Sequence, residues 1–184
     1  MEKLSLFHGT ELKNAKKILN GKFKVAKNDE HWLGNGIYFF EDEPLAKWWT
    51  TNPTTKFGTP QIKEPAVIEC QIEIDRQDIL DLRCLEDYHF FCEMYKNEYL
   101  KQMLSNSSEK PLEIAKLRCA FCDFMQERYQ YKMIVGTFYK PDQPYLPRKY
   151  GKYFKKFRLP YIEIQYSVFD NSIITKKEII EMED

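Results

Sequence analysis

Hydrophobic and polar residues alternate along several short stretches of this chain. The clearest stretch is 68–74, which reads Ile-Glu-Cys-Gln-Ile-Glu-Ile. A period of two is typical of a strand that buries one face and exposes the other. Further apolar stretches predict four more strands and a short terminal element: 3–8, 37–40, 132–139, 160–169 and 173–180.

Apolar residues spaced three and four apart predict the helices. One helix is expected over 11–19, and a second begins at Asp42-Glu43-Pro44, because acidic residues and proline favour a first turn. Two longer helices are predicted near 85–104 and from Pro111 to about 128. The mixture of elements predicts an α+β fold in a single domain, 1–184, since 184 residues are too few to expect two domains.

Composition adds a cellular context to this outline. Aromatic residues make up 15% of the chain, which suits a packed core and a pocket for planar ligands. No run of about eighteen apolar residues occurs and no apolar leader opens the chain, so neither a membrane span nor a signal peptide is expected. Five cysteines without a framework spacing favour reduced thiols and a cytoplasmic location. Cys119 and Cys122 have a zinc-like spacing but no second pair, so no metal site is predicted.

Two glycine-containing segments carry the candidate chemistry. The first predicted strand ends in His8-Gly9-Thr10, and the turn Gly36-Ile37-Tyr38-Phe39 comes after the first helix. Together they resemble the NAD pocket of ADP-ribosyltransferases of the poly(ADP-ribose) polymerase type. The resemblance implies a split antiparallel sheet with flanking helices, and residues about 83–130 would be a helical insertion. It also implies NAD as the co-substrate.

The resemblance assigns roles to the residues of the first segment. His8 would hydrogen-bond the adenosine ribose, and the backbone of Gly9 would bond the nicotinamide carboxamide, assisted by Thr10. Glycine suits this position because the absent side chain permits close approach of a ligand to the backbone. For a histidine considered alone, a strand-end residue with a local hydrogen bond is the plainer interpretation.

The second segment would clamp the nicotinamide ring. The turn that begins at Gly36 would place Tyr38 against one face of the ring. In the family, a second aromatic residue follows an alanine on the next helix, which here corresponds to Trp48, with Trp49 as the fallback. The plainer alternative is that these aromatic residues belong to the core, as most aromatic residues do.

The last long strand completes the resemblance. Residues 161–170 are similar to the family's Glu-Tyr-x-Val-Tyr-Asp motif, with Gln165 in place of the catalytic glutamate. Strand alternation puts Glu163, Gln165 and Ser167 on one face, and the intervening apolar residues from Ile162 to Val168 on the core face. Alternatively, Glu163 and Gln165 are solvated residues of an edge strand.

The glutamine shapes the activity that is expected. It can accept a hydrogen bond from the ribose 2′-hydroxyl, but it carries no charge to stabilise a developing cation, and Glu163 would have to supply the carboxylate. The resemblance therefore implies a mono-ADP-ribosyltransferase, a glycosyltransferase that cleaves NAD, of the toxin or phage-defence kind. Two alternatives remain: a pseudoenzyme that binds NAD or ADP-ribose or serves as an interaction module, and an NAD glycohydrolase.

A basic segment precedes the last long strand. Residues 147–158 hold six of the 28 basic residues and no acidic residue, and four aromatic residues lie among them. Cations for phosphates and rings for stacking favour a single-stranded nucleic acid, RNA or DNA, narrowly over a protein as the acceptor. A solvated loop is the plainer alternative. An antitoxin is a further expected partner. The proposed acceptor-binding residues are the six cations: Arg148, Lys149, Lys152, Lys155, Lys156 and Arg158.

Overall fold

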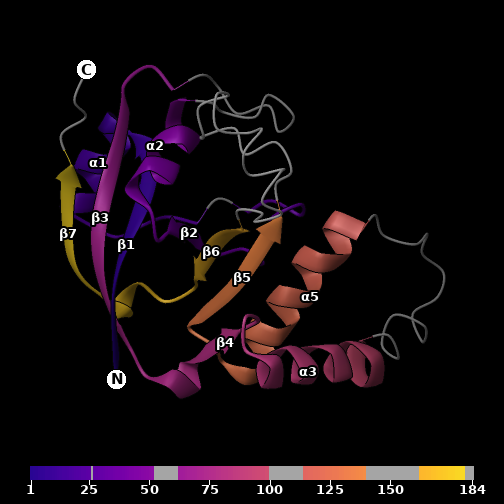
Figure 1. Cartoon of the computed structure of the whole chain (residues 1–184). Helices are drawn as coiled ribbons and strands as arrows, with labels where there is room; N and C mark the ends of the chain where they lie inside the picture. The colour runs from indigo at the N-terminus through magenta and orange to yellow at the C-terminus, as the bar shows by residue number, and fades with distance from the viewer. Residues whose placement is uncertain (26, 52–61, 100–113, 140–161, 181–184) are drawn as a thin grey trace, which may run out of the picture.

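The computed structural model describes residues 1–25, 27–51, 62–99, 114–139 and 162–180 (Figure 1). Its strands are β1 (Glu2–Glu11), β2 (Ile37–Phe40), β3 (Pro65–Ile74), β4 (Ile79–Asp81), β5 (Met133–Tyr139), β6 (Ile162–Val168) and β7 (Ile174–Ile180). Its helices are α1 (Leu12–Leu19), α2 (Glu43–Thr51), α3 (Leu85–Met94), followed by a π-helical turn (Tyr95–Tyr99), and α5 (Ile114–Tyr129). The predicted order of strands and helices is confirmed in these ranges, and the short strand β4 was not predicted.

The seven strands form one sheet in the order β4-β5-β6-β2-β1-β3-β7. All neighbouring strands are antiparallel except β4 and β5, which confirms an α+β fold with a mostly antiparallel sheet. β1 pairs with β3 along its whole length, whereas it pairs with β2 only at Phe7↔Phe40. The sheet is thus divided into a β1–β3–β7 half and a β2–β6–β5–β4 half, which run in different directions in Figure 1.

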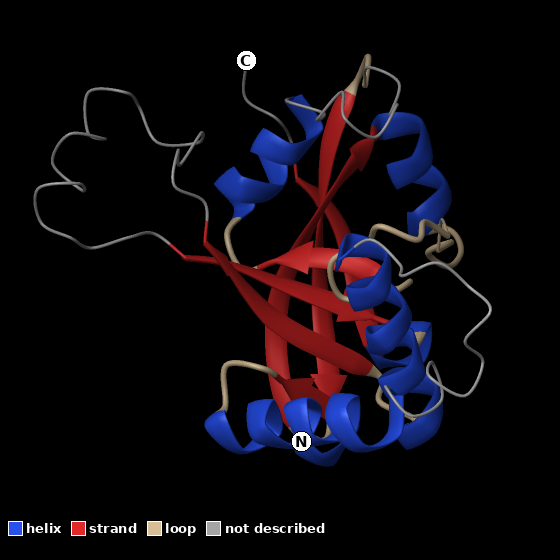
Figure 2. Ribbon diagram, turned by 90° about the vertical axis from the view of Figure 1, so that its right-hand side faces the viewer, coloured by secondary structure: helices blue, strands red, loops and turns tan. Residues whose placement is uncertain are grey.

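Helices α1 and α2 cover opposite faces of the β1–β3–β7 half. Side chains alternate along β1, so Leu6 packs in one cluster with Ala15 of α1, and Phe7 packs in another with Ala46 of α2. Both alanines are fully buried. Figure 2 shows the strands crossing the middle of the molecule with helices packed around them.

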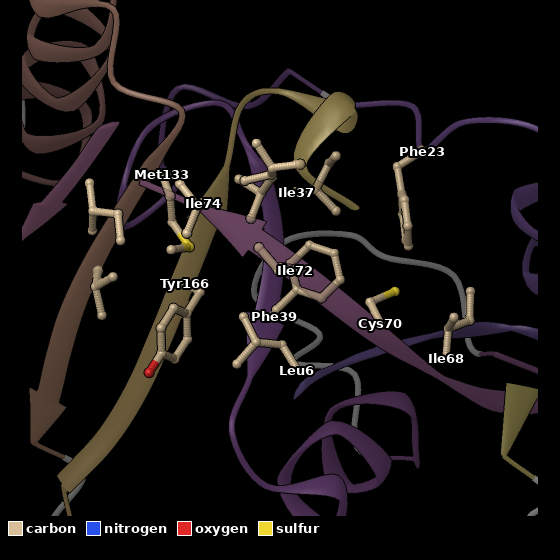
Figure 3. Close-up of a cluster of buried hydrophobic side chains, with 14 of the residues drawn as sticks. Leu6, Phe23, Ile37, Phe39, Ile68, Cys70, Ile72, Ile74, Met133 and Tyr166 are labelled. Carbon is tan, nitrogen blue, oxygen red and sulfur yellow. The ribbon is translucent and has the colours of Figure 1, made fainter. Parts of the chain in front are cut away.

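The main core joins the two halves of the sheet. Phe39 of β2 is fully buried and lies beside Leu6 of β1 and Ile72 of β3, while Tyr166 and Met133 come from β6 and β5 (Figure 3). Burying a large apolar side chain contributes about 1.5–3 kcal/mol. Packing on this face therefore holds the halves together where the hydrogen-bond ladder is reduced to a single pair.

Helices α3 and α5 lie between β4 and β5 in the chain, where a helical insertion was predicted. Phe121 and Met125 of α5 are buried against Leu80 of β4 and Ile134 of β5. This second cluster also includes the ring of Tyr38 from β2, so α5 reaches the strand that carries the predicted clamp. None of the described helices is long and apolar enough to span a membrane.

Candidate functional site

The division between β1 and β2 exposes backbone groups in a defined direction. The Leu12 amide donates to the carbonyl of Glu64 at 2.8 Å, which continues the β1–β3 ladder by one residue. The amide and the carbonyl of one strand residue point to the same neighbouring strand, and those of the next residue point to the opposite side. The backbone amides and carbonyls of the even-numbered residues of β1 therefore point toward β3. Those of the odd-numbered residues point toward β2, as at Phe7 in its pair with Phe40. By the same parity, the amide and carbonyl of Gly9 point toward β2.

His8 lies at this division and contacts β2 through its side chain. Its Nδ1 is 2.7 Å from the backbone carbonyl oxygen of Tyr38. Because a carbonyl oxygen only accepts, Nδ1 carries the proton and Nε2 remains the acceptor when the ring is neutral. The rings of Phe23 and Phe39 lie 5.1 Å and 5.6 Å from the imidazole and fix its plane.

The protonation state of His8 follows from its surroundings. Burial lowers the pKa of His8 below its ordinary value of 6.5, and the hydrogen bond to the Tyr38 carbonyl opposes this only in part. The neutral imidazole therefore dominates at pH 7. Its Nε2 can accept a hydrogen bond from a hydroxyl group of a ligand.

Tyr38 has a hydroxyl group that is bound on both sides. It accepts a hydrogen bond from the Leu33 amide at 2.7 Å and donates to the Gly34 carbonyl at 2.9 Å. Burial raises the pKa of Tyr38, so the phenol stays protonated. The imidazole of His31 lies 5.3 Å from the tyrosine ring. Sequence reasoning gave His31 no role, because nothing in the sequence places it beside Tyr38.

The glycines of both segments have packing reasons of their own. A Cβ atom built on Gly9 would lie 2.4 Å from the carbonyl oxygen of Ala46 in α2. One built on Gly36 would lie 2.2 Å from the hydroxyl oxygen of Ser167 in β6. Both positions therefore demand glycine irrespective of any ligand. The close approach of α2 keeps Gly9 in place beside the division.

Gln165 and Glu163 lie on β6, the strand next to β2. The register pairs Tyr38 with Ser167 and Phe40 with Gln165, so these residues share one face of the sheet. Glu163 is 0% exposed and Gln165 4% exposed, and the side-chain amide of Gln165 donates to a carboxylate oxygen of Glu163. The alternative of solvated residues on an edge strand is wrong, since both side chains are buried and β6 pairs with β5 at both positions and also with β2 at Gln165.

The two tryptophans of α2 occupy different surroundings. Trp49 stacks on Phe40 with ring centroids 6.0 Å apart and planes 15° apart, within the cluster under α2. Trp48 makes an edge contact with Trp49 at 5.4 Å. Thr10 is partly buried in β1, opposite Ala66 of β3. The choice of Trp48 over Trp49 as the second clamp stays a prediction.

The chain is similar to an archaeal protein. The chain is 30% identical over 200 residues to the uncharacterized protein MJ0359 of Methanocaldococcus jannaschii, covering 98% of this chain and 89% of the archaeal one. The chain belongs to the MJ0359 family. No family model matches the sequence, and no solved structure matches it.

The structure brings part of the predicted site onto adjacent strands, and another part lies outside its described residues. His8, Gly9, Tyr38 and Gln165 stand on the three adjacent strands β1, β2 and β6. The basic segment 147–158, with all six proposed acceptor-binding cations, lies outside the described residues. Within the described ranges, no group of three or more His, Cys, Asp or Glu side chains could hold a metal ion.

A second polar cluster, which the sequence did not indicate, fastens the end of β2 to its neighbours. Arg83 follows β4 and donates twice to Asp81 at 2.9 Å, to the Tyr166 hydroxyl at 3.1 Å and to Glu41 at 3.2 Å. The Tyr166 hydroxyl also donates to Glu41. Because Glu41 follows Phe40 directly, this cluster holds the last residue of β2 opposite Gln165.

Proposed function

We propose that this protein is an NAD-dependent mono-ADP-ribosyltransferase with an ADP-ribosyltransferase-like split sheet. The observation that carries the proposal is the division between β1 and β2. On one side of it stand the backbone groups of Gly9 and the imidazole of His8, and on the other stands Tyr38. These three residues are among those that the sequence resemblance assigns to NAD. The His8 imidazole lies on the Phe39 face of the sheet and the Tyr38 ring on the Phe40 face, so in this proposal the dinucleotide spans the division between β1 and β2.

Each group suits one part of the dinucleotide. The amide and carbonyl of Gly9 complement the carboxamide of nicotinamide, which has one acceptor and one donor group. The Tyr38 ring is fixed through its hydroxyl and supplies a stacking face. The neutral His8 supplies Nε2 as an acceptor for a hydroxyl of the adenosine ribose.

The reaction breaks the bond between ribose C1 and the nicotinamide nitrogen. Nicotinamide leaves with the bonding electrons, and the acceptor nucleophile forms the new bond to C1 and loses a proton. The carbonyl oxygen of Gln165 can hold the ribose 2′-hydroxyl, because its amide nitrogen already donates to Glu163. The Glu163 carboxylate brings negative charge next to the site where positive charge develops. Without a glutamate at 165, single transfer is favoured over chain extension.

The acceptor is expected to be a macromolecule, with nucleic acid narrowly preferred over protein. The preference rests on the six cations and four aromatic residues of 147–158, which precede β6 in the chain. A role as a toxin or phage-defence effector, with an antitoxin partner, follows from the resemblance alone.

Labelled NAD tests the proposed function. The protein is incubated with cell extract and NAD that carries one label on the adenylate and another on nicotinamide. The proposal predicts free labelled nicotinamide and adenylate label on a macromolecule, sensitive to nuclease if the acceptor is nucleic acid. Free ADP-ribose without labelled macromolecule would identify a glycohydrolase. NAD binding without any turnover would identify a pseudoenzyme.

A further inference from the structure

The loop before β2 is hydrogen-bonded to a carboxylate of helix α5. Asp123 of α5 accepts hydrogen bonds from the amide nitrogen and the side-chain nitrogen of Asn35, both at 2.6 Å. Each of the two donors binds a different oxygen of the carboxylate. The side-chain oxygen of Asn35 accepts in turn from the Asn28 amide at 2.8 Å. A two-bond contact to a carboxylate of this kind fixes both position and direction.

The same loop is held from its inner side by Tyr38. The tyrosine hydroxyl bonds Leu33 and Gly34, which immediately precede Asn35. Gly34 has a φ of +79°, and a Cβ atom there would lie 2.6 Å from a carboxylate oxygen of Asp123. The loop therefore fits between the Tyr38 hydroxyl and Asp123, and only glycine at 34 allows that spacing.

Further contacts to the loop lie on the same face of α5. Cys119, one turn before Asp123, donates from its thiol to the Asn28 carbonyl at 3.3 Å. Lys116, a further turn back, pairs with Asp29 at 3.1 Å, and this pair is largely exposed. Burial raises the pKa of Cys119 to about 11, so the thiol remains a donor at neutral pH. The helical insertion is thus attached to the segment that leads into Tyr38.

We propose that Asp123 is a positioning residue for the nicotinamide clamp. Through Asn35 it sets the loop whose backbone binds the Tyr38 hydroxyl, and so it sets the plane of the tyrosine ring. This gives the helical insertion a function in substrate binding. The inference rests on the proposed function, because the positioned ring matters only if Tyr38 stacks on nicotinamide.

Exchanging the two partners tests this role. Asp123→Asn puts its single amino group against one of the two donors of Asn35 in either orientation of the new amide, so one bond is lost. Asn35→Asp sets two carboxylates against each other. In the double variant Asp123→Asn/Asn35→Asp, the backbone amide of residue 35 again donates to an oxygen of residue 123, and the side-chain bond forms with its direction reversed. Asp29→Asn, which removes only the exposed ion pair to the same helix, is the matched control.

The NAD dissociation constant, KM and kcat are measured for all five proteins. Each single variant is expected to raise the dissociation constant and KM roughly tenfold with kcat little changed, the double variant to recover, and the control to match wild type. If the role of Asp123 were purely structural, the variants would contain less folded protein. The apparent kcat would then fall and KM would stay unchanged. Wild-type affinity in Asp123→Asn, or no recovery in the double variant, would overturn this role alone. Absence of NAD binding by the wild-type protein would overturn the proposed function and this role with it.

Discussion

At the residue scale, His8 shows how one backbone carbonyl determines the chemistry of a side chain. The sequence placed this histidine at the end of a strand beside a glycine. The structure adds the Tyr38 carbonyl, 2.7 Å from Nδ1, and the two phenylalanine rings around the imidazole. Burial keeps the ring neutral although the hydrogen bond to the carbonyl opposes it, and that hydrogen bond leaves Nε2 as the acceptor.

The lowered pKa of His8 predicts how stability depends on pH. The unfolded chain takes up a proton near the ordinary value of 6.5, whereas the folded protein takes it up only at lower pH. The free energy of unfolding should therefore fall as the pH is lowered from 6.5 toward the folded pKa, by at most about 1.4 kcal/mol per pH unit for one histidine. Urea unfolding between pH 7.5 and 5 measures this slope.

The control variant for this prediction keeps a hydrogen-bond donor at position 8 and removes the titrating imidazole. His8→Asn places an amide donor near the position of Nδ1, and it should flatten the slope in part. A remaining slope is expected because burial also lowers the pKa of His31. An unchanged slope in His8→Asn would show that His8 does not carry the pH dependence.

At the element scale, β6 shows what strand alternation predicts and where it stops. Alternation placed Glu163 and Gln165 together on the face away from the main core, and both lie there and are buried. It also predicted Ile162 on the core face, yet Ile162 is 49% exposed. The reason is that β2 ends at Phe40, opposite Gln165, so the start of β6 pairs with β5 alone.

Substitutions at Gln165 test its proposed part in the reaction. Gln165→Ala should lower turnover roughly a hundredfold with little change in NAD affinity, since the lost contact forms chiefly in the transition state. Glu163→Gln should also impair turnover. Gln165→Glu sets two buried carboxylates side by side, so one of them binds a proton more tightly. NAD cleavage by this variant should therefore match or exceed wild type only at raised pH.

A matched control uses the neighbouring strand. Thr137→Ala changes an exposed residue of β5 opposite Ile164, on the other face of the sheet, and should leave the rate unchanged. Steady-state nicotinamide release from pH 6 to 9 measures all four variants. Wild-type rates in both Gln165→Ala and Glu163→Gln would show that β6 does not carry the reaction.

The elements missing from the sequence prediction share a physical cause. β4 has three residues, which is too short for a period of two to be recognised. The contact between Asn35 and Asp123 joins residues 88 positions apart, and nothing local in either segment indicates the other. Local pattern therefore predicted most of the strands and helices, and the resemblance predicted a set of site residues. Only the folded chain shows the hydrogen bonds between the loop and α5.

At the scale of the whole molecule, the two halves of the sheet meet through one pair of residues in the strand ladder and through a shared core. The pair is Phe7↔Phe40, and Phe39 lies between side chains of both halves on the opposite face. Each half contributes a different part of the proposed site. Strand β1 supplies His8 and Gly9, and strands β2 and β6 supply Tyr38 and Gln165. NAD should therefore bind where the halves meet.

Titration of the isotope-labelled protein with NAD, followed by backbone amide NMR, tests that prediction most directly. The amide signals of Gly9 and Tyr38 should move most, while those of Lys176 and Glu178 on the outer strand β7 should stay in place. Saturating NAD without movement at Gly9 and Tyr38 would contradict it. So would movement confined to the open hollow lined by Asp75, Arg76 and Tyr131.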